Sequence, residues 1–332
     1  MKIFALAAAL AVGAALPAHA DWKPNKPINI IVPWSAGGST DQVTRVVAPL
    51  LEEALGTSVV VVNQPGASGS IGTKAALDAP RDGYTWTANA VANNATYAVT
   101  GLIEDTSIAD YEIYLHVANV PVVSVNADSK YQDFGQLLEA MKTRSDDVTV
   151  ATAGVNSSGG MALAAIKEAA GDIGARMISY DGGNPAAIAA ASGEAIATTQ
   201  LAVEQTEMIK GGKLRPLAVL ADKPLVVEGL DPIPSITEWL PEMEIAADFF
   251  GILIPVGAPP EVYETVEKIW NEKIQNSKEL QEYATSRGAV FDPASGKTAM
   301  DKAMPVVIAE ACARVTRGEA VIDPSTIGIT CP

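Results

Sequence analysis

INIIVPWSAGGSTDQVTRVVAPLL, residues 28–51, combines the features of a strand, a glycine turn and the start of a helix. The β-branched run at 28–32 is typical of a strand buried on both faces, and Pro33 ends it because proline cannot donate to a sheet ladder. Gly37 and Gly38 permit backbone angles that a side chain would forbid. The capping residues that follow, and the helical spacing of the apolar residues after them, predict a helix from about Ser39.

The start of this helix is a candidate site for an anion. A helix start exposes unpaired N–H groups and the positive end of the peptide dipole, and both favour negative charge. The alternative is a turn that only reverses the chain. We expect Asp41, in the first turn of the helix, to act as a cap or dipole partner rather than to contact a ligand.

The N-terminus has the pattern of a secretory signal. Lys2 supplies a positive start, residues 3–16 are apolar, and residues 18–20 (AHA) form a cleavage site. We therefore expect an exported protein that is cleaved after Ala20. No later segment reaches about 18 uninterrupted apolar residues, so the sequence predicts no membrane span.

The charge of the chain narrows the choice of partners. The 332 residues carry a net charge of −16, and loss of Lys2 with the signal makes it one unit more negative. An acidic surface argues against nucleic acid and anionic membrane as partners. An anionic ligand stays possible, since N–H groups in a cleft can outweigh a distant, salt-screened surface charge.

The reactive side chains are few. We expect the two cysteines, Cys312 and Cys331, to form a disulfide that holds the C-terminal tail against the last helix. His116 is the one histidine after the signal and lies in an apolar run, which favours a core residue over a ligand. No G-x-S-x-G motif and no His/Cys/Asp/Glu cluster is present, so we expect no metal, no cofactor and no enzyme.

Strand and helix signals alternate along the chain and predict an α/β fold. The glycines at 66–72 do not follow the dinucleotide fingerprint. An apolar stretch at 112–126, interrupted by Pro121, predicts a hinge near 119–123, after which the alternation resumes. Two such sheets with ligand loops at their strand ends would form a cleft between them. The predicted strands are 28–32, 58–62, 84–89, 148–151, 176–179, 195–199 and 214–220. The first predicted helix starts at about 39 and is ended by Gly56, and the others are 73–77, 134–142, 161–170, 186–191 and 203–210.

Several motifs, in order, resemble the substrate-binding proteins of tripartite tricarboxylate transporters, often called the Bug family. They span most of the chain from Trp22 to Glu310, which makes the likeness more specific than any single motif. The matching segments are KPI at 26–28, VPWSAGGSTD at 32–41 with Arg45, VNQPGASGSIG at 62–72, DGYT at 82–85, YDGGNPA at 180–186, GGKLRPLAV at 211–219 and IPVGAP at 254–259.

The resemblance implies a two-lobed periplasmic binding protein, type II-like, with a mostly parallel sheet flanked by helices in each lobe. Lobe 1 would comprise 21–120 plus 244–332, and lobe 2 would comprise 121–243. It further implies a monomer that binds a small organic acid and delivers it to the membrane permease subunits of the transporter. Two alternatives are a periplasmic ligand-sensing module and, less favoured, a secreted hydrolase.

The turns at 35–40 and 156–160 are the candidate contact loops for the ligand carboxylate, and residues around 180–186 are expected to close the site. Family members often have a histidine after the second-lobe serine turn, where this chain has Gly159-Gly160-Met161, and Asp181 stands where many have a basic or neutral residue. We expect Asp181 to face solvent. The predicted ligand-binding residues are Trp34, Ser35, Ala36, Gly37, Gly38, Ser39, Thr40, Ala67, Asn89, Asn156, Ser157, Ser158, Tyr180, Asn184, Pro185 and Ala186.

Overall fold

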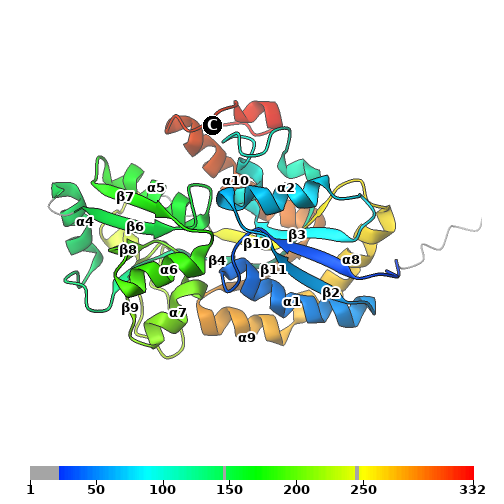
Figure 1. Ribbon diagram of the computed structural model, residues 1–332, viewed down its shortest axis with the longest axis horizontal. Coiled ribbons are helices and arrows are strands. Elements are labelled where there is room, and N and C mark those ends of the chain that lie inside the picture. Colours follow the sequence, from blue (N-terminus) through cyan, green and yellow to red (C-terminus); the bar gives the residue numbers. More distant parts are fainter. Residues whose placement is uncertain (1–21, 145–146, 244–246) are drawn as a thin grey trace, which may run out of the picture.

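The computed structural model describes residues 22–144, 147–243 and 247–332. The chain forms two α/β lobes side by side, each a β-sheet with helices on both faces, as Figure 1 shows. This confirms the predicted two-lobed α/β class. The predicted signal, residues 1–20, lies outside the described residues. Within those residues, no helix combines the length and apolar character that crossing a membrane requires.

The first sheet takes strands from both ends of the chain, in the order β11-β4-β10-β3-β1-β2. β1 pairs in parallel with β2 and β3, whereas β10 runs antiparallel to β3 and β4, and β11 antiparallel to β4. The prediction of a mostly parallel sheet is therefore wrong for this lobe, because β10 and β11 make three of its five strand pairings antiparallel. The strands are β1 (Ile28–Val32), β2 (Val59–Asn63), β3 (Thr85–Ala90), β4 (Tyr111–Asn119), β10 (Asp248–Pro255) and β11 (Val290–Ser295).

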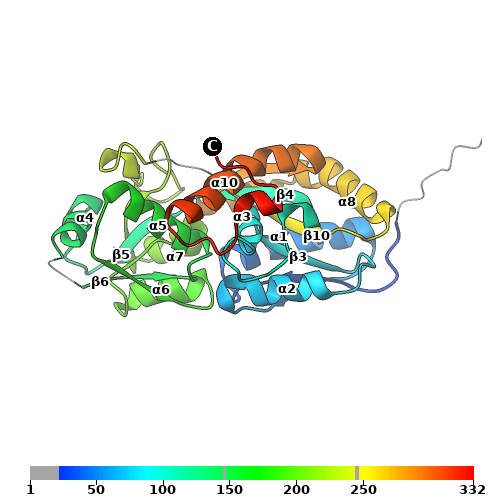
Figure 2. The same cartoon turned by 90° about the horizontal axis from the view of Figure 1, so that it is seen from above.

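Helices cover both faces of this sheet. α1, α8 and α9 bury their apolar residues against one face, and α2, α3 and α10 cover the other, as Figures 1 and 2 show. α1 carries Val43, Val47 and Leu51 into the core, all fully buried, as the helical spacing predicts. The helices are α1 (Ser39–Leu55), α2 (Ser70–Asp78), α3 (Val91–Thr96), α8 (Pro260–Glu272), α9 (Lys278–Arg287) and α10 (Gly296–Thr316).

The second sheet has the order β7-β6-β8-β5-β9. β6 is parallel to β7 and β8, and β5 is antiparallel to β8 and β9. α4 and α5 cover one face, and α6 and α7 the other. The elements are β5 (Val122–Asn126), β6 (Val148–Thr152), β7 (Ala175–Ser179), β8 (Ala197–Thr198), β9 (Leu214–Val219), α4 (Phe134–Thr143), α5 (Ser158–Ala170), α6 (Gly183–Ser192) and α7 (Ala202–Lys210).

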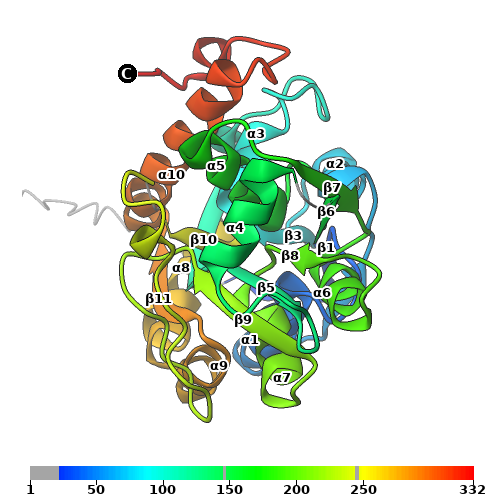
Figure 3. The same cartoon turned by 90° about the vertical axis from the view of Figure 1, so that its left-hand side faces the viewer.

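The apolar stretch at 112–126 belongs to both sheets. β4 ends at Asn119 in the first sheet and β5 begins at Val122 in the second, so the chain crosses between them at 120–121. His116, within β4, is fully buried, and burial lowers its pKa to about 3. It is a neutral core residue, as its apolar surroundings in the sequence predict. β10 begins beside this crossing, since Asp248 pairs with Asn119. Figure 3 views the protein along its long axis, with the second lobe in front.

The predicted disulfide is present between Cys312 on α10 and Cys331 near the C-terminus. It holds a tail that packs on the first lobe. Val321 N donates to Val99 O at 2.7 Å, and Ile329 is buried in the core shared by α3 and α10.

Replacing Cys312 and Cys331 with serine should lower the free energy of unfolding by about 3 kcal/mol, because the open tail gains conformational entropy when the protein unfolds. Ligand affinity should not change, since neither cysteine is among the residues that line the cavity between the starts of α1 and α5, which is described below. Denaturant unfolding and calorimetry measure the two quantities. Free thiols in the native exported protein, or an unchanged stability, would contradict the structural role.

Candidate functional site

The starts of α1 and α5, one from each lobe, face a shared cavity. α1 begins at Ser39 and α5 at Ser158, each directly after the turn that follows a central strand. The cavity between them has a volume of about 20 Å³. Five predicted ligand-binding residues line it: Trp34, Ser39, Thr40, Ser157 and Ser158.

Asp41 shapes the first of these turns. Its carboxylate accepts hydrogen bonds from Gly37 N, Arg45 Nε and Asn63 Nδ2, each at 2.9 Å. Burial raises the pKa of this carboxyl, but the hydrogen bonds and the charge of Arg45 outweigh burial and lower it overall. Gly37 has a φ of 81°, which a side chain would rarely adopt. Asp41 therefore holds the turn and does not itself line the cavity, as the sequence predicts.

Asp41→Ala should cost about 1–3 kcal/mol of stability and weaken ligand binding, because it leaves Gly37 N and Asn63 Nδ2 without their shared acceptor. The matched control is Asp78→Ala, which removes an exposed carboxylate paired only with Lys74 on α2. That control should change stability by less than about 0.5 kcal/mol. Thermal unfolding and calorimetry of both variants test the claim, and equal effects would refute it.

A hydrogen bond to Asn89 holds the indole ring of Trp34 in place. The Trp34 Nε1–H donates to Asn89 Oδ1 at 2.9 Å, and Asn89 Nδ2 donates in turn to Asn94 Oδ1 at 2.6 Å. Asn89 is fully buried and is not among the residues that line the cavity. Its position is that of a support for the Trp34 ring.

The second turn is closed by its own serine. Ser157 Oγ donates to Gly154 O at 2.7 Å and accepts from Gly160 N at 3.0 Å, which caps α5. Asn156 is fully buried, and its Nδ2 donates to Thr100 Oγ1 at 2.8 Å, after α3 of the first lobe. The turn is thus tied both to its own helix and to the opposite lobe.

The turns of the two lobes touch directly. Ser35 N donates to Asp181 O at 3.1 Å. A Cβ on Gly37 would lie 3.0 Å from Asn184 Nδ2, and a Cβ on Gly154 would collide with Ser68 Oγ. Asp181 itself is exposed, as expected. The structure is therefore a closed arrangement of the two lobes.

Other predicted residues are not among those that line the cavity. The Tyr180 hydroxyl donates to Glu194 Oε1 at 2.8 Å at an exposed position. Ala186 is fully buried in a small alanine core, and Pro185 precedes it in α6. Ala36 and Ala67 are exposed. Of the remaining predicted residues, Gly38 is buried at the N-cap of α1.

Sequence reasoning missed Glu204, a residue of α7 in the second lobe. Its Oε1 accepts from Ser39 N at 2.9 Å, and its Oε2 accepts from Leu201 N at 3.2 Å. The Gln200 amide, oriented to satisfy its neighbours, donates to the same Oε2 at 3.0 Å. Glu204 thus occupies the start of α1, where the sequence predicts the carboxylate of a ligand.

Burial governs the charge of Glu204. It raises the pKa to about 7, although the hydrogen bonds from Ser39 and Leu201 act in the opposite direction. A Cβ on Gly183 would collide with the carboxylate, so glycine is required beside it. In the sequence Glu204 resembles any solvated glutamate in a helix, and no local pattern reveals its contact with a turn 165 residues away.

The chemistry of the cavity suits an anion that comes with a hydrogen-bond donor or acceptor. Helix-start N–H groups and the hydroxyls of Ser39, Thr40 and Ser158 offer donors, and Glu204 offers a carboxyl that is half protonated near neutral pH. Among the described residues, no group of three or more His, Cys, Asp or Glu side chains is arranged to hold a metal ion.

The family model and the similar proteins indicate the same family. The model of the tripartite tricarboxylate transporter family receptor matches residues 43–299. Protein BugT of Bordetella pertussis is 32% identical over 284 residues, which cover 83% of this chain and 85% of BugT.

Two solved structures share the fold. R. palustris Rpa4515 with adipate superposes with a TM-score of 0.79 at 23% identity, covering 89% of this chain and 98% of that one. MatC from Rhodopseudomonas palustris with bound malate superposes with a TM-score of 0.74 at 19% identity, covering 89% and 97%.

Proposed function

This chain belongs to the tripartite tricarboxylate transporter receptor family, a family of periplasmic solute-binding proteins, and from this premise we propose that it captures a small organic acid between its lobes. It then delivers the acid to the permease subunits of a tripartite tricarboxylate-type transporter. The role is binding and conformational change, without catalysis.

The observation that carries this proposal is the pair of helix starts at one cavity. Ser39 and Ser158 begin helices in different lobes, and both line the same space. Two dipole ends favour one negative charge between them. The carboxylates named for the two structural neighbours, adipate and malate, agree with this chemistry.

We assign 21–120 plus 244–332 to lobe 1 and 121–243 to lobe 2. The sheet membership of β4 and β5 supports this division, since the chain changes sheets at 120–121. A cavity of about 20 Å³ holds roughly one water molecule, so an organic acid must enter while the lobes are apart, and the lobes must stay further apart around it than they are in this structure. Closure then buries the acid, as in other hinge-closing proteins.

Glu204 sets a condition on the ligand. A carboxylate ligand at the start of α1 must either displace Glu204 or share a proton with it, because two ionised carboxylates in one buried site repel. A proton between the ligand and Glu204 turns that repulsion into a hydrogen bond. The same site would accept a hydroxyl or amine of the ligand at Glu204 while the helix starts hold its carboxylate.

A thermal-shift screen of the mature protein against mono-, di- and tricarboxylates, followed by calorimetry, tests the function. At least one acid should raise the melting temperature and bind with 1:1 stoichiometry, and its amide analogue should not. Binding of none of the acids, or equal binding of the amide, would contradict the proposal. Deleting the gene separates the roles: lost uptake of that acid supports transport, and lost induction with intact uptake indicates a sensor.

A further inference from the structure

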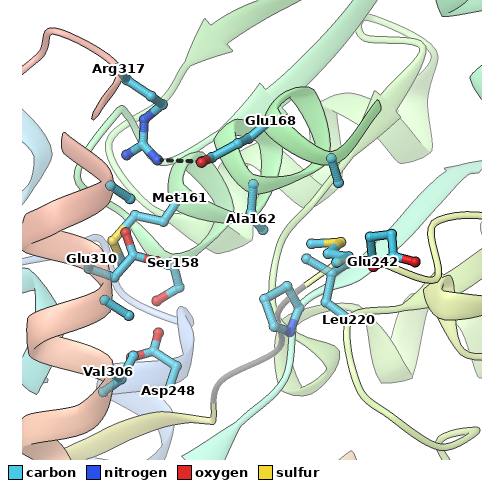
Figure 4. Close-up of a pocket in the computed structure, with 16 residues that line it drawn as sticks. Ser158, Met161, Ala162, Glu168, Leu220, Glu242, Asp248, Val306, Glu310 and Arg317 are labelled. Carbon is cyan, nitrogen blue, oxygen red and sulfur yellow. Dashed lines mark hydrogen bonds and ion pairs between the residues drawn. The ribbon is translucent and has the colours of Figure 1, made fainter. Parts of the chain in front are cut away.

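A second cavity, of about 550 Å³, lies between α5 of the second lobe and α10 of the first (Figure 4). Pro121, at the crossing between the sheets, and Leu220 bound its far side. Ser158 is the one lining residue that it shares with the small cavity described above. None of the glycine turn at 35–38 reaches it, so it is a separate space.

An unpaired buried carboxylate faces this cavity. Asp248, the first residue of β10, is 7% exposed. The Ser158 hydroxyl is close enough to lower its pKa, yet neither carboxylate oxygen has a partner that meets hydrogen-bond geometry among the described residues. Figure 4 shows the Asp248, Ser158 and Glu310 side chains converging on the α10 side of the cavity. Burial of an ionised group without a partner is costly, so this arrangement calls for a positive charge or a proton.

The other charged groups around the cavity do not supply that charge. α5 contributes Glu168, the segment before β10 contributes Glu242, and α10 contributes Glu310. Arg317 also lines the cavity, but it lies 3.5 Å from Glu168 and 3.2 Å from Glu319. Four carboxylates therefore surround the space with one arginine, which forms ion pairs with Glu168 and Glu319 but whose Nε and Nη2 have no hydrogen-bond partner among the described residues.

Arg314, the other nearby cation, is directed elsewhere. It is buried and pairs with Glu319 at 2.7 Å, while its Nη2 donates to Val155 O at 2.8 Å. Its charge and that of Arg317 act on Glu310, yet burial still raises the pKa of Glu310. Neither arginine touches Asp248 in the hydrogen bonds and ion pairs of the described chain.

The remaining lining defines the shape of an occupant. Met161, Val306, Leu220 and Met243 supply an apolar wall beside the carboxylates. Among the described residues that line the cavity there is no aromatic ring, so they offer no cage of the usual kind for a quaternary ammonium group. Carboxylate oxygens instead suit an ammonium group that carries N–H donors.

We propose that this cavity is a binding site for a small primary alkylammonium ion. Its N–H groups bind Asp248 and Glu310, and its alkyl chain lies against Met161 and Val306. The ion would contact α5 and α10 at once and would therefore favour the closed arrangement of the lobes. This site and the acid site proposed above use different charged residues, but they share Ser158 and are coupled through closure of the lobes.

The protonation of Asp248 gives the proposal a distinctive signature. Burial raises its pKa to about 7, the Ser158 hydroxyl acts in the opposite direction, and the charge of Glu310 adds to the rise. A cation that binds beside Asp248 favours the ionised form, so binding at pH 7 should release about half a proton from it. Affinity should rise as the pH increases from 6 to 8, with Glu168, Glu242, Glu310, Arg314 and Arg317 as the surrounding charges.

Calorimetry of the mature protein with n-butylammonium chloride tests the site, with 1-butanol and tetramethylammonium as controls. We expect saturable binding of n-butylammonium alone. Asp248→Asn should weaken it by at least about thirtyfold, whereas Glu238→Gln, at an exposed carboxylate of the second lobe that does not line the cavity, should change it less than about threefold. Organic-acid binding by Asp248→Asn should stay as in the wild type.

Proton release on binding tests the proposed ammonium site even if Asp248→Asn does not fold. Titrations of the wild type at pH 7 in buffers of different ionisation enthalpy should give different observed binding enthalpies, because the buffer takes up the proton that binding releases. Absence of n-butylammonium binding, binding without proton release, or equal binding of 1-butanol would each overturn the proposal.

Discussion

Glu204→Gln should bind the cognate organic acid about tenfold more tightly than the wild type at pH 8. The Glu204 pKa is raised to about 7, so about one wild-type molecule in ten carries the proton at pH 8. A carboxylate ligand needs that proton, because an ionised Glu204 would repel it. Glutamine keeps the acceptor for Ser39 N and removes the charge.

The preference of the ligand for protonated Glu204 also sets the sign of the pH dependence of binding. The anion prefers protonated Glu204, so wild-type affinity should rise as the pH falls from 8 to 6 and level off below 6. Glu204→Gln should show a flat profile over this range. The control is Glu207→Gln, which neutralises an exposed glutamate of the same helix and should follow the wild type. Weaker binding by Glu204→Gln at pH 8 would contradict the claim that ionised Glu204 repels the ligand carboxylate.

Ser39→Asp should abolish acid binding, with a loss of more than about a hundredfold. Ser39 is buried at the start of α1, and its N–H bonds Glu204 Oε1. An aspartate there adds a negative charge beside both the ligand carboxylate and Glu204, in a medium of low dielectric. Like charges at close range should also hold the lobes apart.

The matched variant for this test is Ser39→Ala, which keeps the backbone N–H and removes the hydroxyl. It should weaken binding by no more than about tenfold, the value of one neutral hydrogen bond. Calorimetry measures both affinities, and circular dichroism establishes that each variant is folded. If folded Ser39→Asp binds the acid as the wild type does, the carboxylate does not lie at the start of α1.

The local parts of the fold could be predicted from the sequence. The strand, glycine turn and helix at 28–51 depend on neighbouring residues, and β1 and α1 form where the pattern indicates. The disulfide and the buried state of His116 also followed from composition and local context. Short-range propensity and burial decide such features.

Features that depend on distant contacts could not be predicted. β10 lies between β3 and β4, far from either in sequence, and makes the sheet mixed. Asn89 follows a predicted strand like a rim residue, yet it supports Trp34 from behind. Glu204 and Asp248 are ordinary acidic residues until tertiary packing buries them, which no pattern in one sequence reveals.

A crystal structure of the mature protein with the tightest-binding acid of the screen tests the central claim most directly. Our account predicts a ligand carboxylate within about 3.2 Å of donors at the starts of both α1 and α5, namely Ser39 or Thr40 and Ser157 or Ser158. A carboxylate that contacts one lobe alone, or an acid seated between α5 and α10 beside Asp248, would contradict it.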